Sequence, residues 1–302
     1  MFLRSAIIII SLFIAAGCSQ EKSPAKTSVD KKKQLLIGLI PEQNIFKQLE
    51  RYDHMANYLS DKTGTRITLK ILPRYGNIID NFNSNRLDGA FFVSFTYALA
   101  HSRLGVEVVA RPENLNGVST YHGVIFVRKD SGIRSLQGMK GKRFALVDKA
   151  TTAGYLLPME YLRTNGVEDP KAYLKELYFA GTHEDAIYDV LNRKADIGAA
   201  KNTVFDRLAA VDVRIKNTLT VLVKSPDVPE NALALRADLE GELKEKIRKV
   251  ILSMHQDPAG REVLIRFGAS RFVETFERDY EVVYRYAREA GIDLAAYEYR
   301  NE

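Results

Sequence analysis

Apolar runs of strand length alternate with helically spaced apolar positions along most of this 302-residue chain. The first run, Leu35 to Ile40, is interrupted only by Gly38 and ends at Pro41, as expected for a buried parallel strand. From there the pattern predicts strand, helix, strand, helix and strand over residues 35–40, 46–59, 65–72, 78–85 and 87–93. This order predicts an open parallel sheet with helices on both faces, in which ligands bind beyond the carboxyl ends of the strands.

A second series of the same kind begins near Tyr121. It predicts strands over 121–128, 143–148, 173–179 and 197–200 and helices over 133–139, 153–165 and 183–193. Two further strands, over 219–223 and 232–235, lead back to the first series, and the segments 242–254, 260–267 and 276–290 are predicted helical. We therefore expect two α/β lobes, with crossings near Ser119 and Lys224 and a cleft between them. The expected lobes are residues 34–118 with 225–302, and residues 119–224.

The first seventeen residues have the pattern of an export signal. Arg4 precedes an apolar run over 6–14, and the small residues 15–17 end directly on Cys18. The run is shorter than the about 20 apolar residues of a membrane-spanning helix. It resembles a bacterial lipoprotein signal, except that Ala15 stands where that pattern usually has a leucine-like residue. The resemblance implies a lipid on Cys18 that anchors the protein to the extracytoplasmic (periplasmic) face of a membrane; an ordinary cleaved signal with an incidental cysteine is the alternative.

Composition and charge narrow the function further. Cys18 is the only cysteine, which excludes an intramolecular disulfide, a thiol catalyst and a cysteine-ligated metal site in the folded part. Six lysines and arginines and two acidic residues lie within 1–33, so most of the net charge of +6 belongs to that segment. Residues 18–33 are polar without apolar periodicity, and we expect a flexible tether there. No basic groove with interleaved aromatic residues favours nucleic acid.

Several segments in a fixed order resemble one known family. They are LPRYGNIIDNF from Leu72, LDGAFFVSFTYALA from Leu87, YHGVIFVRKDSGIRSLQGMKGKRFALVDKATTAGYLLP from Tyr121, AGTHEDAIYDVLNRKADIGAA from Ala180 and KSPDVPENALALR from Lys224. Over residues 35–275 the chain is similar to the phosphate, phosphite and phosphonate substrate-binding proteins of ABC importers, of the PhnD-like kind. The resemblance implies an α/β, two-lobed periplasmic-binding-protein fold of type II, each lobe an open sheet flanked by helices, with two crossover segments. It also implies a monomer without cofactor, which binds a small oxyanion in the cleft for an ABC permease and ATPase complex.

The same resemblance implies an anion loop at Thr151, Thr152 and Ala153. The start of a helix there would direct free N–H groups and a favourable dipole at an oxyanion. Ser94 and Thr96, just after the third strand, would add donors from the first lobe. The alternative is that Thr152, Ser94 and Thr96 are helix caps.

The resemblance implies three further ligand contacts. His183 follows a glycine, as the ligand-contacting histidine of the family does, and Tyr75 and Tyr121 match positions that present phenolic hydroxyls. In the alternative, Thr182 and Asp185 cap a helix and leave His183 exposed, and each tyrosine hydroxyl is satisfied by a nearby carbonyl. The other four histidines, His54, His101, His122 and His255, lack metal-ligand spacing.

Members of the family that bind aminoalkylphosphonates place acidic residues where this chain has Thr203 and Asn231. Because a neutral pair does not offset the desolvation of an ammonium group, we expect a ligand without an amine, contacted by Asn231. Two other functions stay open: a binding protein that presents its ligand to a membrane sensor kinase, and an enzyme on the same fold. For an enzyme, the chain shows no nucleophile and base pair, no paired carboxylates and no metal cluster.

Overall fold

A computed structural model describes residues 34–42, 44–84 and 86–301 of the chain. The predicted signal, Cys18 and the predicted tether lie outside the described residues. Within the described part, no helix is both long and apolar enough to cross a membrane.

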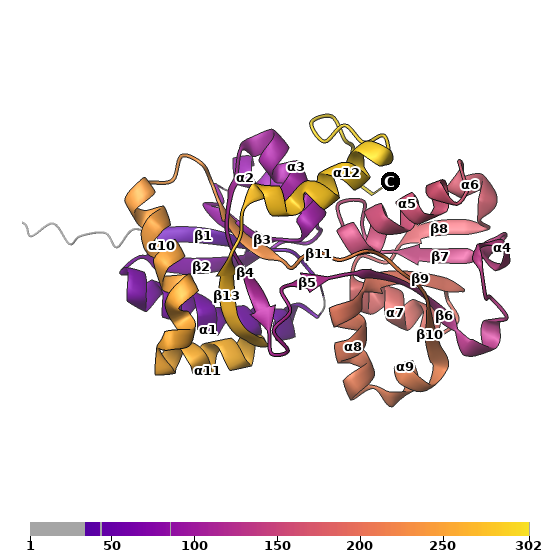
Figure 1. The fold of residues 1–302 in the computed structure, drawn as a ribbon, viewed down its shortest axis with the longest axis horizontal. Coiled ribbons are helices and arrows are strands. Elements are labelled where there is room, and N and C mark those ends of the chain that lie inside the picture. The colour runs from indigo at the N-terminus through magenta and orange to yellow at the C-terminus, as the bar shows by residue number, and fades with distance from the viewer. Residues whose placement is uncertain (1–33, 43, 85, 302) are drawn as a thin grey trace, which may run out of the picture. The chain divides into compact units, whose positions relative to one another are not determined.

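The first sheet has six strands in the order β13-β4-β12-β3-β1-β2 (Figure 1). Their bounds are β1 Gln34–Leu39, β2 Arg66–Ile71, β3 Gly89–Phe92, β4 Glu107–Asn114, β12 Ala232–Leu235 and β13 Ala269–Glu274. β1 runs parallel to β2 and β3, whereas β12, β4 and β13 pair antiparallel. The sheet is therefore mixed, and the expectation of a parallel sheet is wrong, because β12 enters between β3 and β4 in the opposite direction.

The second sheet has five strands in the order β10-β6-β9-β7-β8. Their bounds are β6 Gly123–Arg128, β7 Arg143–Leu146, β8 Glu176–Phe179, β9 Ile197–Lys201 and β10 Leu219–Lys224. β7 runs parallel to β8 and β9, and β6 pairs antiparallel with β9 and β10. This sheet is mixed as well.

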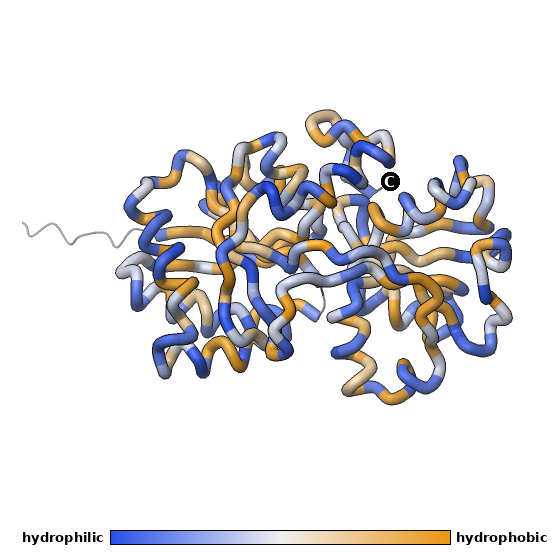
Figure 2. The backbone as a smooth tube through the Cα atoms, viewed as in Figure 1, coloured by the Kyte–Doolittle hydropathy of each residue, from blue (hydrophilic) through white to orange (hydrophobic). Residues whose placement is uncertain are grey.

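Helices cover both faces of the first sheet because its central strands, β1, β3 and β12, are apolar on both sides. Leu35, Ile37 and Leu39 of β1 share a buried cluster with residues of α1 (Ile45–Thr63), α10 (Gly241–Ser253) and α11 (Pro258–Phe267). Leu36, on the opposite face, packs against the cluster that contains residues of α2 (Asn77–Ser84), α3 (Ser94–Leu104) and α12 (Glu281–Glu289). Figure 2 shows this distribution as largely hydrophobic strands between helices of mixed hydropathy.

The second sheet carries α4 (Leu136–Met139), α5 (Leu157–Thr164), α6 (Pro170–Tyr173), α7 (His183–Leu191), α8 (Asn202–Val211) and α9 (Val213–Thr218). The chain passes between the two sheets through β5 (Thr120–Tyr121) and β11 (Val228–Pro229), which pair antiparallel. The exact lobe limits of the sequence analysis stay a prediction. One buried cluster contains Phe92 of β3 and Phe126 of β6, so apolar packing is continuous from one sheet to the other.

Candidate functional site

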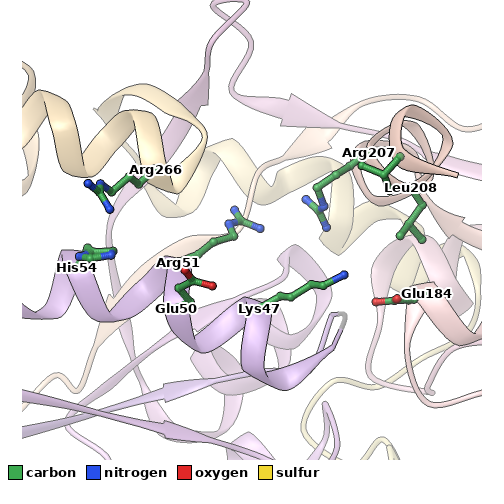
Figure 3. Close-up of a pocket in the computed structure, with 9 residues that line it drawn as sticks. Lys47, Glu50, Arg51, His54, Glu184, Arg207, Leu208 and Arg266 are labelled. Carbon is green, nitrogen blue, oxygen red and sulfur yellow. The ribbon is translucent and has the colours of Figure 1, made fainter.

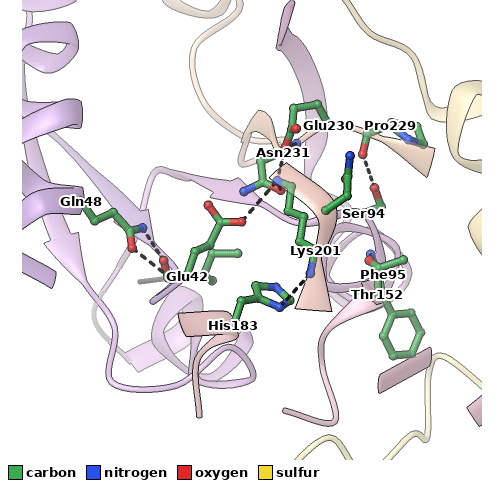
Figure 4. A network of polar contacts seen from close by, with 12 residues as sticks. Glu42, Gln48, Ser94, Phe95, Thr152, His183, Lys201, Pro229, Glu230 and Asn231 are labelled. Carbon is green, nitrogen blue, oxygen red and sulfur yellow. Dashed lines mark hydrogen bonds and ion pairs between the residues drawn. The ribbon is translucent and has the colours of Figure 1, made fainter. Parts of the chain in front are cut away.

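All nine residues predicted to contact a ligand are buried, each at most 5% exposed. They are Tyr75, Ser94, Thr96, Tyr121, Thr151, Thr152, Ala153, His183 and Asn231. They come from elements of both sheets, and hydrogen bonds and ring contacts link most of them to one another or to shared neighbours. Figure 4 shows those of Ser94, Thr152, His183 and Asn231.

The predicted anion loop follows β7. Its helix begins with a π-helical turn, Thr152–Leu156, before α5 continues it. Gly154 is needed here: a Cβ on it would lie 2.4 Å from the Cβ of Val147, so the turn presses directly on the end of the strand. A π-helical turn is rare and occurs frequently at functional sites.

The two threonine hydroxyls of this loop have different partners. Thr151 Oγ1 donates to the carbonyl of Asp148 at 2.7 Å, whereas Thr152 Oγ1 accepts from the backbone N–H of Phe95 in α3 at 2.8 Å. Thr152 therefore joins the loop to an element of the other sheet and is not a helix cap. A hydroxyl that accepts a hydrogen bond still carries its own proton, which it can donate.

Ser94 and Thr96 are not helix caps either, since α3 has Val93 as its N-cap residue. Ser94 Oγ donates to the carbonyl of Pro229 at 2.6 Å, and Thr96 Oγ1 donates to the carbonyl of Ala150 at 2.8 Å. Their protons are used on backbone carbonyls. The structure thus favours a positioning role for these two residues, holding α3 against β11 and against the residue before the loop.

The hydroxyls of Tyr75 and Tyr121 are buried, and within the described residues neither has a hydrogen-bond partner. Burial raises the pKa of both phenols. For Tyr121, the charge of Lys201 and the nearby hydroxyls of Thr152 and Ser94, which lie within reach of its oxygen but not in hydrogen-bond geometry, act in the opposite direction. Both phenols therefore stay protonated at neutral pH and can donate. The alternative in which a carbonyl satisfies each hydroxyl finds no support among the described residues.

His183 begins α7, and Thr182 caps that helix by accepting from the N–H of Asp185 at 3.0 Å. The capping alternative is right about Thr182 but wrong about exposure, because His183 is buried. Burial lowers the pKa of His183 to about 3, so its ring is neutral at neutral pH. Its Nδ1 lies 3.2 Å from the backbone N–H of Lys201, which donates to it. The ring proton is therefore on Nε2, which can donate to a ligand.

A charged cluster that the sequence analysis missed lies beside these donors. The ammonium group of Lys201, buried at the end of β9, lies 3.3 Å from Glu42 Oε1 and 3.0 Å from Asn231 Oδ1, and it contacts Glu230 Oε1 (Figure 4). It also lies 4.4 Å from the ring centroid of Tyr121. The available signal was a lysine that directly follows the apolar run Ile197–Ala200.

Charge pairing outweighs burial in this cluster. Burial alone would raise the pKa of Glu42, but Lys201, His183 and Asn231 hold it at about 2. Burial alone would lower the pKa of Lys201, and Glu230 and Glu42 raise it instead. The cluster therefore carries one ammonium and carboxylates at neutral pH, and Asn231 binds Lys201 directly.

The segment after α12 makes hydrogen bonds to the residues that precede the predicted anion loop. Asn301 accepts from the N–H of Lys149 and donates to Asp148 Oδ2, both at 3.0 Å, and Tyr297 donates to the carbonyl of Lys149 at 3.2 Å. Tyr299 donates to Asp80 of α2 at 2.7 Å. The segment therefore connects the first sheet to the residues just before Thr151.

Within the described ranges, no group of three or more His, Cys, Asp or Glu residues could hold a metal ion. What the site offers instead is a set of neutral donors, Tyr75, Tyr121, His183 and Thr152, around the start of a helix. Such a set suits an oxyanion better than a cation.

Residues 37–280 match the family described as the phosphonate periplasmic substrate-binding protein of ABC transporters. The phosphonates-binding periplasmic protein of Escherichia coli is 26% identical over 254 residues, 83% of this chain and 74% of its own length. The phosphate-import protein PhnD of Mycolicibacterium smegmatis is 24% identical over 246 residues, 78% of this chain and 76% of its own.

Solved structures show the same fold. A binding-protein component of an ABC phosphonate transporter from Pseudomonas aeruginosa matches with a TM-score of 0.80 at 23% identity, over 86% of this chain and 87% of that one. PhnD1 of Prochlorococcus marinus, in complex with methylphosphonate, matches with a TM-score of 0.77 at 22% identity, over 86% and 99%. The expected two-sheet fold of a type II periplasmic binding protein is thus confirmed. The chain belongs to the family of phosphonate periplasmic substrate-binding proteins of ABC transporters.

Proposed function

We propose that this protein binds a small oxyanion, namely phosphate, phosphite or an alkylphosphonate, and passes it unchanged to an ABC permease and ATPase complex. The observation that carries the proposal is the pair of buried hydroxyls of Tyr75 and Tyr121, for which residues 34–42, 44–84 and 86–301 supply no hydrogen-bond partner. A buried hydroxyl without a partner costs about 1–3 kcal/mol, so an acceptor between the two would repay that cost. The proposed site acts by binding, without catalysis.

The groups proposed to contact the oxyanion are all neutral hydrogen-bond donors. The hydroxyls of Tyr75, Tyr121 and Thr152, Nε2 of His183 and the backbone N–H of Ala153 supply hydrogen bonds to a charged acceptor, each contributing about 1.5–3 kcal/mol. The free N–H groups at the start of the helix add a favourable dipole. This donor set suits a tetrahedral oxyanion with several acceptor oxygens.

The proposed ligand lacks an amine, but for a different reason than the neutral pair Thr203 and Asn231. Carboxylates of Glu42 and Glu230 lie beside Asn231, and they already hold the ammonium of Lys201. The chain thus supplies its own cation to this cluster. An amine-bearing ligand would compete with Lys201 for the same carboxylates.

We propose that residues 34–118 with 225–302 and residues 119–224 form two lobes that open at β5 and β11. Contacts between them support this: Thr152 with Phe95, Thr96 with Ala150, and Lys201 with Glu42. All three lie close to the proposed donors. Opening would break them together and release the ligand.

Titration calorimetry against phosphate, phosphite, methylphosphonate, sulfate and 2-aminoethylphosphonate tests the proposed function. We expect binding of at least one of the first three and weaker binding of 2-aminoethylphosphonate. Replacing Tyr75 and Tyr121 together by phenylalanine keeps both rings and removes both donors, so the affinity should fall by about ten-fold or more. Unchanged affinity in that variant would show that the anion binds elsewhere, and no binding of any oxyanion would contradict the proposal itself.

We also propose that Cys18 carries a lipid that anchors the protein, as a monomer, to the extracytoplasmic face of a membrane. The support is the sequence pattern that ends on the sole cysteine. Cys18→Ser should move the exported protein from the membrane fraction to the soluble fraction, as measured by fractionation and immunoblotting. If the variant stays with the membrane to the same extent as the parent, the lipid anchor is not at Cys18.

A further inference from the structure

A basic groove lies apart from the tyrosine and histidine donors. It encloses about 420 Å³ and is lined by Lys47, Glu50, Arg51 and His54 of α1, Glu184 of α7, Arg207, Leu208 and Val211 of α8, and Arg266 of α11 (Figure 3). We call it the basic groove. Four of these side chains are cationic and two are carboxylates. The elements that line it belong to both sheets.

The four cations of the basic groove outnumber its two carboxylates, Glu50 and Glu184. Glu184 accepts from the backbone N–H of Asn44 at 3.0 Å, and Arg51 donates to the carbonyl of Phe267 at 2.9 Å. In the described part of the chain, the ion pairs found involve none of the groove's lysine and arginine side chains. Lys47 also lies in the first turn of α1, where the helix dipole disfavours a positive charge.

Arg207 shows the excess of positive charge in the basic groove most clearly. Its Nη2 atom is buried and, among the described residues, has no hydrogen-bond partner. Burial lowers the pKa of Arg207 and the charge of Arg51 lowers it further, whereas the carboxylates of Glu42 and Glu230 act in the opposite direction. Figure 3 shows the guanidinium groups of Arg51 and Arg207 directed toward each other from α1 and α8. An anion between these two like charges would reduce their repulsion and could accept from the unused donor.

The chemistry of the donors indicates the class of anion. Two guanidinium groups present planar pairs of N–H donors that match the oxygens of phosphate groups, and Lys47 adds a point charge. We propose that the basic groove is a second anion-binding site, which takes a soluble oxyanion of the phosphate class with two or more negative charges.

A second, smaller space shares two lining residues with the basic groove. This space of about 100 Å³ is also lined by Arg51 and Arg207, and its other lining residues include Glu42, Lys201, Glu230 and Asn231. Arg51 and Arg207 therefore border both spaces. None of the donors of the proposed function lines either space, so the basic groove and the proposed site share no residue.

Inorganic pyrophosphate, a small and multiply charged anion, is the probe. Calorimetric titration of the full chain should detect pyrophosphate binding that weakens as sodium chloride is raised. Arg207→Gln should lower this affinity by about ten-fold or more. Lys47→Gln, at an exposed position where folding is not at risk, should lower it by a smaller factor.

Two controls keep this result separate from the proposed function. Arg285→Gln makes the same change of charge on α12, outside the groove, and Thr152→Val alters the proposed anion loop; both should bind pyrophosphate as the parent does. If Arg207→Gln and Arg285→Gln lower the affinity for pyrophosphate equally, the effect comes from net charge alone and the proposal is overturned. Loss in Thr152→Val would place pyrophosphate at the loop, and no binding by the parent would also overturn the proposal. If the protein binds pyrophosphate but none of the other oxyanions, the second anion-binding site is supported and only the proposed function is contradicted.

Discussion

Replacing Lys201 by methionine is expected to lower the free energy of unfolding by about 3–5 kcal/mol, the usual cost of breaking a buried ion pair from one side. The variant leaves the buried carboxylate of Glu42 and the partly buried carboxylate of Glu230 without the ammonium that both contact. Urea unfolding followed by circular dichroism measures the loss. As a matched control, Lys62→Met removes an exposed lysine that pairs with Asp257 at 2.7 Å, and it should cost at most about 1 kcal/mol.

The pH dependence of this loss follows from Glu42. In the parent, charge pairing holds the pKa of Glu42 at about 2, below its ordinary value of 4.5. Without Lys201, burial dominates and raises that pKa above 4.5, so the folded variant takes up a proton before the unfolded chain does. The loss of stability is then largest at neutral pH and shrinks as the pH falls toward 4.5. Adding Glu42→Gln and Glu230→Gln to Lys201→Met should restore much of the stability. A Lys201→Met variant no less stable than Lys62→Met would show that the cluster does not depend on its cation.

Replacing Thr152 by valine is expected to weaken binding of the oxyanion found in the screen by about ten-fold or more, since one hydrogen bond to a charged group is lost. The same change leaves the N–H of Phe95 without its acceptor, so the melting temperature should fall as well. Thr152→Ser keeps the hydroxyl and should retain most of the affinity. Calorimetric titration and melting curves measure the two effects separately.

The neighbouring threonine provides the control. Thr151 Oγ1 already donates its proton to the carbonyl of Asp148, so Thr151→Val should lower stability by about 1 kcal/mol and affect affinity much less than Thr152→Val does. Equal affinities of Thr152→Val and Thr151→Val would remove Thr152 from the proposed site. A loss of stability in Thr152→Val without a loss of affinity would leave the link to Phe95 as its only role.

The hydrophobic pattern predicts most of the fold because apolar residues recur at different spacings in buried strands and in amphipathic helices. The predicted strand over 232–235 coincides with β12, and the predicted helix over 242–254 is close to α10, Gly241–Ser253. β4 and β13 escaped prediction since both are rich in polar residues, and β4 also contains Pro112. The two strands pair with each other, with Pro112 opposite Phe272. Because they are far apart in sequence, the local hydrophobic pattern contains no sign of this pairing.

The sequence predicted which residues gather at the candidate site, but it did not predict the charged side chains beside them. The resemblance indicated nine side chains that are buried, yet it gave no sign that the protons of Ser94 and Thr96 are used on carbonyls. Lys201 and Glu42 are 159 positions apart in sequence, and their pairing depends on the arrangement of the two sheets. Contacts of this kind follow from tertiary structure, which single-residue patterns do not contain.

Completion of the six-stranded sheet must await synthesis of residues 232–274, because β12 lies between β3 and β4 and β13 pairs with β4. A nascent chain that ends before β12 has no strand to join β3 to β4, and both keep unpaired edges. Pairing over such sequence distances forms slowly. The first sheet therefore stays incomplete until most of the chain has been made, whereas the five strands of the second sheet all lie within residues 123–224.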